Sequence, residues 1–200
     1  MREPFLEFVE EKLGGDFVLI ACGLPGTWKT ETTQEVARIK GYPMLRSDII
    51  RLEVLKGEDI FDGQVASNMD KRTAVYEEVF RQAYQALHES EGVILDATFV
   101  SQSLRRRAAE IAAEHDRRFV ILQTHCPQEV AIGRILRRTR EDYQSNALTE
   151  EAYLNNKRRF EEVDLQGLLA ACPGLRIVHM VVDTASDAPQ DWYVINYTEK

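Results

Sequence analysis

The sequence predicts an α/β fold in which a mostly parallel sheet is covered by helices on both faces. Short apolar runs alternate along the chain with segments whose apolar residues recur at helical spacing, the pattern of β-α-β units. A glycine-bearing loop at 23–30 also follows the apolar run 17–22 and precedes a helix-like stretch. A loop between a strand and a helix is where parallel sheets commonly bind phosphate, because the helix N-terminus carries partial positive charge.

The elements follow from these patterns. Five apolar runs are predicted to be strands, at 17–22, 43–45, 93–95, 119–124 and 177–182. Helical spacing predicts helices at 31–40, 70–89, 101–115 and 128–138, and an acidic amphipathic helix at 1–12. The run 192–197 has the pattern of a strand, which is either an added edge strand or the start of a segment that the pattern does not place.

Length and composition are typical of one globular domain spanning residues 1–200, with a core at 16–187 and a C-terminal tail at 188–200. No apolar run approaches the roughly 20 residues that span a bilayer, so we expect a cytoplasmic protein without a membrane segment. The three cysteines lie on or beside apolar runs and lack metal-ligand spacing, which predicts buried thiols. The net charge of -8 argues against general binding of DNA or RNA. Oligomeric state leaves no signal in the sequence.

The loop at 23–30 has the composition of a phosphate-binding loop. In order, it contains Gly23, Leu24, Pro25, Gly26, Thr27, Trp28, Lys29 and Thr30. In such loops backbone N–H groups surround the β-phosphate, the lysine reaches the β- and γ-phosphates, and the final hydroxyl binds Mg²⁺. Trp28 departs from this pattern, because a glycine usually stands there and lets the backbone approach the phosphate. The indole therefore either points away from the nucleotide or reshapes the loop.

Acidic residues follow the predicted strands, where ligands bind in an open α/β sheet. Asp48 follows the second strand, Asp96 ends the third, and Asp183 ends the fifth. Each could instead cap a helix or form a turn. Beside a phosphate loop, Asp48 is placed to accept a hydroxyl proton, and Arg51 is placed one helical turn later to hold an anionic group of the acceptor. Asp96 is a candidate to bind Mg²⁺ together with Thr30.

A basic segment provides candidate phosphate ligands. Arg134, Arg137 and Arg138 are spaced to share one helix face, and a second charged helix contains Lys157 to Arg159. A loop between two arginine-bearing helices, at about 138–150, predicts a lid that closes over a triphosphate. The alternative interpretation is a solvated helix face.

Together these motifs resemble the small P-loop kinases, a family that includes polynucleotide 5′-hydroxyl kinases, zeta-toxin-like kinases and many AAA-type kinase domains. The resemblance spans residues 16–187 and includes the loop, the Asp48-x-x-Arg51 spacing, the segments 93–99 and 134–140, and Val182 to Thr184. It implies a P-loop fold with a five-stranded parallel sheet of order 2-3-1-4-5, ATP and Mg²⁺ as cofactors, and phosphoryl transfer to a hydroxyl.

The same resemblance assigns roles to individual residues. Asp48 is expected to be the general base, with Lys29 and Arg138 as its catalytic partners, and Arg51 is expected to bind an acceptor phosphate. Arg134, Arg138 and Thr184 join the loop as expected nucleotide ligands.

Two hypotheses remain from the sequence. One is a kinase that transfers the γ-phosphate of ATP to a small-molecule hydroxyl or to a polynucleotide 5′-end, and the other is a non-catalytic nucleotide-binding domain with a degenerate loop. An acceptor base favours the kinase, because a binding module has no use for one. The negative net charge argues against long nucleic acids as acceptors.

Overall fold

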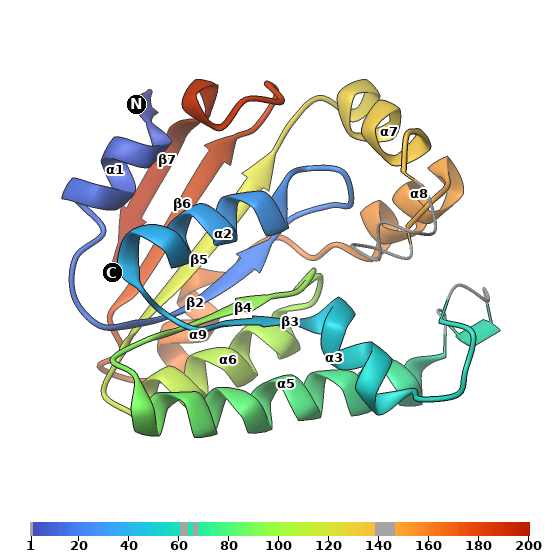
Figure 1. The fold of residues 1–200 in the computed structure, drawn as a ribbon. Coiled ribbons are helices and arrows are strands. Elements are labelled where there is room, and N and C mark those ends of the chain that lie inside the picture. Colours follow the sequence, from blue (N-terminus) through green and yellow to red (C-terminus); the bar gives the residue numbers. More distant parts are fainter. Residues whose placement is uncertain (1, 61–63, 66–67, 139–146) are drawn as a thin grey trace.

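The computed structural model describes residues 2–60, 64–65, 68–138 and 147–200, and it is built around one seven-stranded sheet (Figure 1). The strands lie in the order β1-β7-β6-β5-β2-β4-β3. They are β1 (Glu3–Pro4), β2 (Phe17–Cys22), β3 (Met44–Arg46), β4 (Val93–Asp96), β5 (Arg118–His125), β6 (Ile177–Asp183) and β7 (Tyr193–Glu199). The helices are α1 (Phe5–Glu11), α2 (Lys29–Lys40), α3 (Ser47–Val54), α5 (Met69–Glu89), α6 (Gln102–Glu114), α7 (Gln128–Leu136), α8 (Glu150–Arg159), α9 (Leu165–Ala171) and the short 3₁₀ helix η2 (Pro189–Asp191).

The five predicted strands form the parallel part of the sheet. Strands β3, β4, β2, β5 and β6 are neighbours in that order and all pair in parallel, which confirms the order 2-3-1-4-5. Long stretches of β2, β4 and β5 are fully buried, as expected for strands that helices cover on both faces.

The prediction of five strands was wrong, because the sheet has two more. β7 pairs with β6 in antiparallel orientation, and the two-residue strand β1 pairs with β7. The segment around 192–197 is therefore an added strand beside β6. The chain can return antiparallel here because only a short loop and η2 separate β6 from β7.

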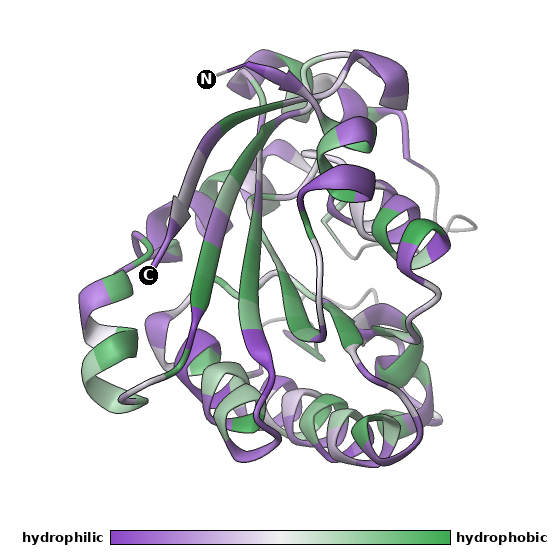
Figure 2. Ribbon diagram, turned by 90° about the vertical axis from the view of Figure 1, so that its left-hand side faces the viewer, coloured by the Kyte–Doolittle hydropathy of each residue, from purple (hydrophilic) through white to green (hydrophobic). Residues whose placement is uncertain are grey.

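Two apolar layers pack on opposite faces of the sheet, and the strands alternate between them with a period of two. On β2, Val18 and Ile20 belong to the core beneath α5, α6 and α9, whereas Phe17 and Leu19 belong to the core beneath α1 and α2. Figure 1 shows these two helix layers on either side of the strands, and Figure 2 shows the apolar colour along the central strands. The carboxyl ends of the parallel strands point toward α3 and α7.

The structure also tests the predictions for the cysteines and for the N-terminal helix. All three cysteines are free and buried, as predicted. The N-terminal helix is shorter than predicted and begins at Phe5, after Pro4, which pairs with β7. Within the described ranges, we find no helix whose length and apolar character would let it cross a bilayer.

Candidate functional site

The loop at 23–30 connects β2 to α2 and needs glycine at two positions. A side-chain carbon on Gly26 would lie 2.4 Å from the carbonyl oxygen of Ala131, and one on Gly23 would lie 2.6 Å from Thr124 Oγ1. Both glycines also have positive φ, of 79° and 146°. The loop therefore packs directly against β5 and α7, and this packing fixes its path.

Trp28 takes the left-handed conformation that a glycine adopts readily, with φ 56° and ψ 39°. Left-handed backbone costs a non-glycine residue about 1–2 kcal/mol. The indole Nε1 donates to Asp187 Oδ1 at 3.3 Å, and the guanidinium of Arg134 lies 4.7 Å from the ring centroid. These contacts hold the ring at the edge of the loop and offset the backbone cost.

Lys29 and Thr30 begin α2 and face the end of β4. Lys29 Nζ donates to the carbonyl oxygen of Leu24 at 2.8 Å, and Thr30 Oγ1 donates to Asp96 Oδ2 at 2.7 Å. Burial lowers the pKa of Lys29 to about 8 and raises the pKa of Asp96 to about 6. Both shifts have the direction that burial of a charged group imposes, and Asp96 in turn raises the pKa of Lys29 while Lys29 lowers that of Asp96.

Asp48 lies in the first turn of α3 and is held by an arginine that the sequence analysis did not select. Arg46 Nη2 donates to Asp48 Oδ2 at 2.6 Å, and Arg46 Nε donates to Oδ1 at 3.2 Å. The backbone N–H of Ile49 donates to the same carboxylate at 2.9 Å. Arg46 Nε also lies 4.0 Å from Asp96 Oδ2, so one guanidinium links the two predicted acidic residues.

One pocket collects most of the predicted site residues. The candidates Lys29, Thr30, Asp48, Arg51, Asp96 and Arg138 all line it. The remaining lining residues are Pro25, Gly26, Trp28, Glu31, Ser47, Ala97 and Thr98. Phosphate-loop, acceptor-side and metal candidates therefore face one cavity at the carboxyl edge of the sheet, as expected for an open α/β sheet.

Arg134 does not line this pocket. Its side chain is 2% exposed, and it donates to the carbonyl oxygens of Gly26, Thr184, Ala185 and Ser186 at 2.9–3.2 Å. It also donates to Asp187 Oδ1 at 2.8 Å. Through these hydrogen bonds, the Arg134 guanidinium connects the phosphate loop to the segment that follows β6.

Thr184 belongs to the same buried region. Its side chain donates to the carbonyl oxygen of Thr27 at 2.9 Å and to that of His125 at 3.1 Å. Most of the predicted lid, at 139–146, lies outside the described residues. Arg138 stands at its start and lines the pocket.

The residues fit a magnesium ion bound together with phosphate. Mg²⁺ is usually held by one or two protein oxygens plus substrate phosphates and water. Thr30 Oγ1 and Asp96 Oδ2 are two oxygen atoms that can act as metal ligands, and they lie within hydrogen-bond distance of each other in the pocket that Lys29 also lines. Within the described ranges, no group of three or more His, Cys, Asp or Glu side chains is placed to hold a metal by itself.

The comparisons with known proteins agree with this geometry. Residues 18–163 match the AAA domain family AAA_33, and the chain belongs to that family. The fold is that of P-loop kinases, a nucleotide-binding fold, with seven strands in this chain.

Solved structures show the same fold at low sequence identity. A gluconokinase from Sinorhizobium meliloti 1021 has 17% identity and a TM-score of 0.59, with 86% of this chain and 84% of that chain covered. A sugar kinase from Janibacter sp. HTCC2649 has 15% identity and a TM-score of 0.56, with 88% of each chain covered. Kti12 from Chaetomium thermophilum, in complex with ADP-AlF3, has 19% identity and a TM-score of 0.51, with 80% and 87% covered. Among curated proteins, none matches this chain.

Proposed function

We propose that the protein is an ATP-dependent phosphotransferase that transfers the γ-phosphate to a hydroxyl acceptor. One observation carries this proposal: the pocket brings the loop lysine and threonine together with Asp48 and Arg51, from a different helix. A site that only bound nucleotide would need Lys29 and Thr30 but would have no use for Asp48 and Arg51. The family and the fold support the same chemistry.

Positive charge in the pocket provides the first part of the proposed mechanism. Phosphoryl transfer depends on positioning and on electrostatic stabilisation of the phosphoryl oxygens. Lys29 and Arg138 face the same cavity and are the two groups we assign to these oxygens. The backbone of the loop and the N-terminus of α2 add N–H groups and partial positive charge.

Asp48 provides the second part. Its carboxylate lines the pocket while Arg46 and the Ile49 amide fix its orientation. We assign it to accept the proton of the acceptor hydroxyl as that oxygen attacks the γ-phosphorus. Arg51, one turn later on α3, is assigned to an anionic group of the acceptor.

Thr30 and Asp96 are the residues that would hold Mg²⁺. When bound, that ion would neutralise charge on the β- and γ-phosphates. Asp96 also orients the Thr30 hydroxyl through their hydrogen bond of 2.7 Å. Arg46, 4.0 Å from Asp96, connects this pair to the acceptor side of the pocket.

Calorimetry with Mg-ATP on the wild type and on Lys29→Ala tests the nucleotide-binding part. We expect micromolar to millimolar binding by the wild type and a large loss in the variant, because the ammonium contributes a charge-assisted contact to phosphate. Lys12→Ala, which removes a lysine from the end of α1, is the control for the charge change. No binding by the wild type, or equal binding by wild type and Lys29→Ala, would contradict the proposal.

The phosphoryl acceptor belongs to a broad class. An acceptor side that consists of Asp48 and Arg51 suits a nucleoside, a sugar, an antibiotic, a metabolite or a polynucleotide 5′-end. Labelled ATP incubated with the protein and each class of compound identifies the acceptor by its phosphorylated product. Within this proposal the protein acts as a cytoplasmic enzyme.

A further inference from the structure

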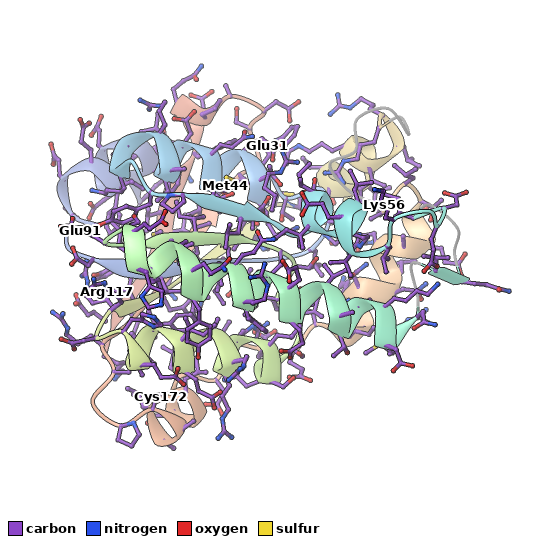
Figure 3. All side chains as sticks on the ribbon, turned by 60° about the horizontal axis from the view of Figure 1, so that its bottom comes forward. Glu31, Met44, Lys56, Glu91, Arg117 and Cys172 are labelled. Atoms are coloured by element: carbon purple, nitrogen blue, oxygen red, sulfur yellow. The ribbon has the colours of Figure 1, made fainter. Side chains whose placement is uncertain are left out.

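Glu31 places a carboxylate inside the phosphate pocket. It follows Lys29 and Thr30 in the first turn of α2, is partly buried, and lines the same cavity as Lys29 and Arg138. Figure 3 shows Glu31 at the end of α2 that lies toward α3 and α7. The roles proposed above for the loop and for Asp48 do not use this residue.

The surroundings of Glu31 are cationic. Burial has the largest effect and raises the pKa of Glu31. Its own backbone N–H, and after it the charges of Arg138, Lys29 and Arg46, oppose that shift. Among the described residues, its carboxylate forms no ion pair and no hydrogen bond with another side chain. By contrast Glu35, one turn further along α2, is paired with Arg38 at 2.8 Å. Within the described ranges, Glu31 is thus a negative charge that lines the same cavity as Lys29 and Arg138 and has no ion-pair partner of its own.

We infer that Glu31 is an internal counter-anion of the phosphate pocket and determines which phosphate ligands the pocket accepts. In the protein without nucleotide, its charge offsets the mutual repulsion of Lys29 and Arg138. When a polyphosphate enters, the carboxylate repels it and competes for the same cations. This inference rests on the proposed nucleotide binding and adds a specificity-determining residue to it.

The ligand's net charge decides how strong that repulsion is. Coulomb energy scales with the product of the charges, so a free polyphosphate is repelled more than one whose charge a divalent cation partly neutralises. Glu31 therefore makes the pocket prefer metal-complexed polyphosphates over free ones.

Calorimetry with inorganic tripolyphosphate, without and with Mg²⁺, tests this role on the wild type and on Glu31→Gln. Removing the charge should tighten binding of free tripolyphosphate on the order of ten-fold, the effect of a unit charge at pocket distances and intermediate dielectric. The gain with Mg²⁺ present should be smaller. Glu35→Gln removes the same charge from the same helix outside the pocket and should change neither affinity by more than about two-fold.

Thermal unfolding provides a second readout. Without ligand, Glu31→Gln should have a Tm no lower than that of the wild type, because burial disfavours the Glu31 charge more than the nearby cations favour it. Tripolyphosphate should raise the Tm of the variant more than that of the wild type, because the variant binds it more tightly. A variant that is less stable and binds tripolyphosphate no better than the wild type would show a merely structural role and overturn the inference.

The outcomes separate this inference from the proposed function. Lys29-dependent binding that Glu31→Gln leaves unchanged overturns the role of Glu31 alone. If neither the wild type nor Glu31→Gln binds tripolyphosphate or Mg-ATP, the proposed function fails and the role of Glu31 fails with it.

Discussion

Arg134 should be among the most costly single residues to remove from this protein, because its side chain is buried and bridges two segments. In Arg134→Met the carbonyl oxygens of Gly26 and Thr184 lose their buried donors. An unsatisfied buried acceptor costs about 1–3 kcal/mol, and loss of the contact with Trp28 adds about 1 kcal/mol. The other acceptors are partly buried and can bind water instead. These costs add up to about 3–7 kcal/mol. Because the Gly26 carbonyl keeps a weak donor in Cys126 Sγ, the expected loss is about 4 kcal/mol of unfolding free energy.

Urea unfolding followed by circular dichroism measures that loss, and a Tm lower by roughly 8–16 °C should accompany it in a chain of this size. Arg137→Met is the matched control, because Arg137 lies on the same helix end, is 69% exposed and approaches Asp187 at 3.5 Å. It should cost less than about 0.5 kcal/mol. If Arg134→Met kept its stability within about 1 kcal/mol and lost only Mg-ATP affinity, Arg134 would be a nucleotide ligand, the role that the family resemblance implies, rather than a structural clamp.

Three other predictions concern the pocket and the sheet. Arg51→Ala should raise the acceptor KM with little change in kcat, because the contact is made in ground and transition states alike, and steady-state kinetics would reveal a contrary fall in kcat alone. Mg-ATP should change the tryptophan fluorescence of the wild type but not of Trp28→Phe, since Trp28 lines the pocket and Trp192 is 1% exposed; an equal change in both would place the signal elsewhere. Burial lowers the pKa of His179 to about 4 from 6.5, because the folded protein disfavours the protonated imidazole. The stability that the neutral imidazole contributes is therefore complete above pH 6.5 and is lost as the pH falls toward 4. Between pH 7 and 5 the wild type should lose about 2 kcal/mol more stability in urea than His179→Gln, and equal losses would refute the assignment.

The sequence was sufficient to predict the parallel sheet, because the buried strands are continuous apolar runs between amphipathic helices. The order of the strands came from the resemblance to P-loop kinases. The sequence did not predict β1, which pairs through Glu3 and Pro4 only. A strand of two residues is too short to show the alternation of apolar and polar residues that predicts a strand. The helix α9 was missed for a related reason, since it has only 7 residues and follows a charged segment.

The predicted residues at strand ends largely met in one pocket, because the topology alone brings the carboxyl ends of parallel strands together. The arginines were harder to place. Spacing predicted one shared face for Arg134, Arg137 and Arg138, but α7 ends at Leu136, so helical periodicity no longer governs Arg138. The observed exposures are 2% for Arg134 and 69% for Arg137.

Two other pocket contacts depend on side-chain direction, which sequence spacing does not give. Arg46 folds back onto Asp48, two residues later, across the junction between β3 and α3. Glu31 follows the loop motif and enters the pocket because the first turn of α2 faces it. Both could have been suspected only from their charge next to a motif residue.

In the proposed function the pocket both binds nucleotide and transfers its γ-phosphate, and Asp48→Asn separates these two activities. After a phosphorylated product has been identified with labelled ATP, single-turnover transfer and Mg-ATP affinity are measured on the wild type and on this variant. Asp59→Asn, a change of the same kind beyond the end of α3, is the control. We predict affinity within a few-fold of the wild type and transfer slower by about 10²- to 10⁴-fold, the usual contribution of a general base. Full transfer by Asp48→Asn would contradict the assignment of the base, and a wild type that binds Mg-ATP but phosphorylates no compound in a broad screen would contradict the kinase itself.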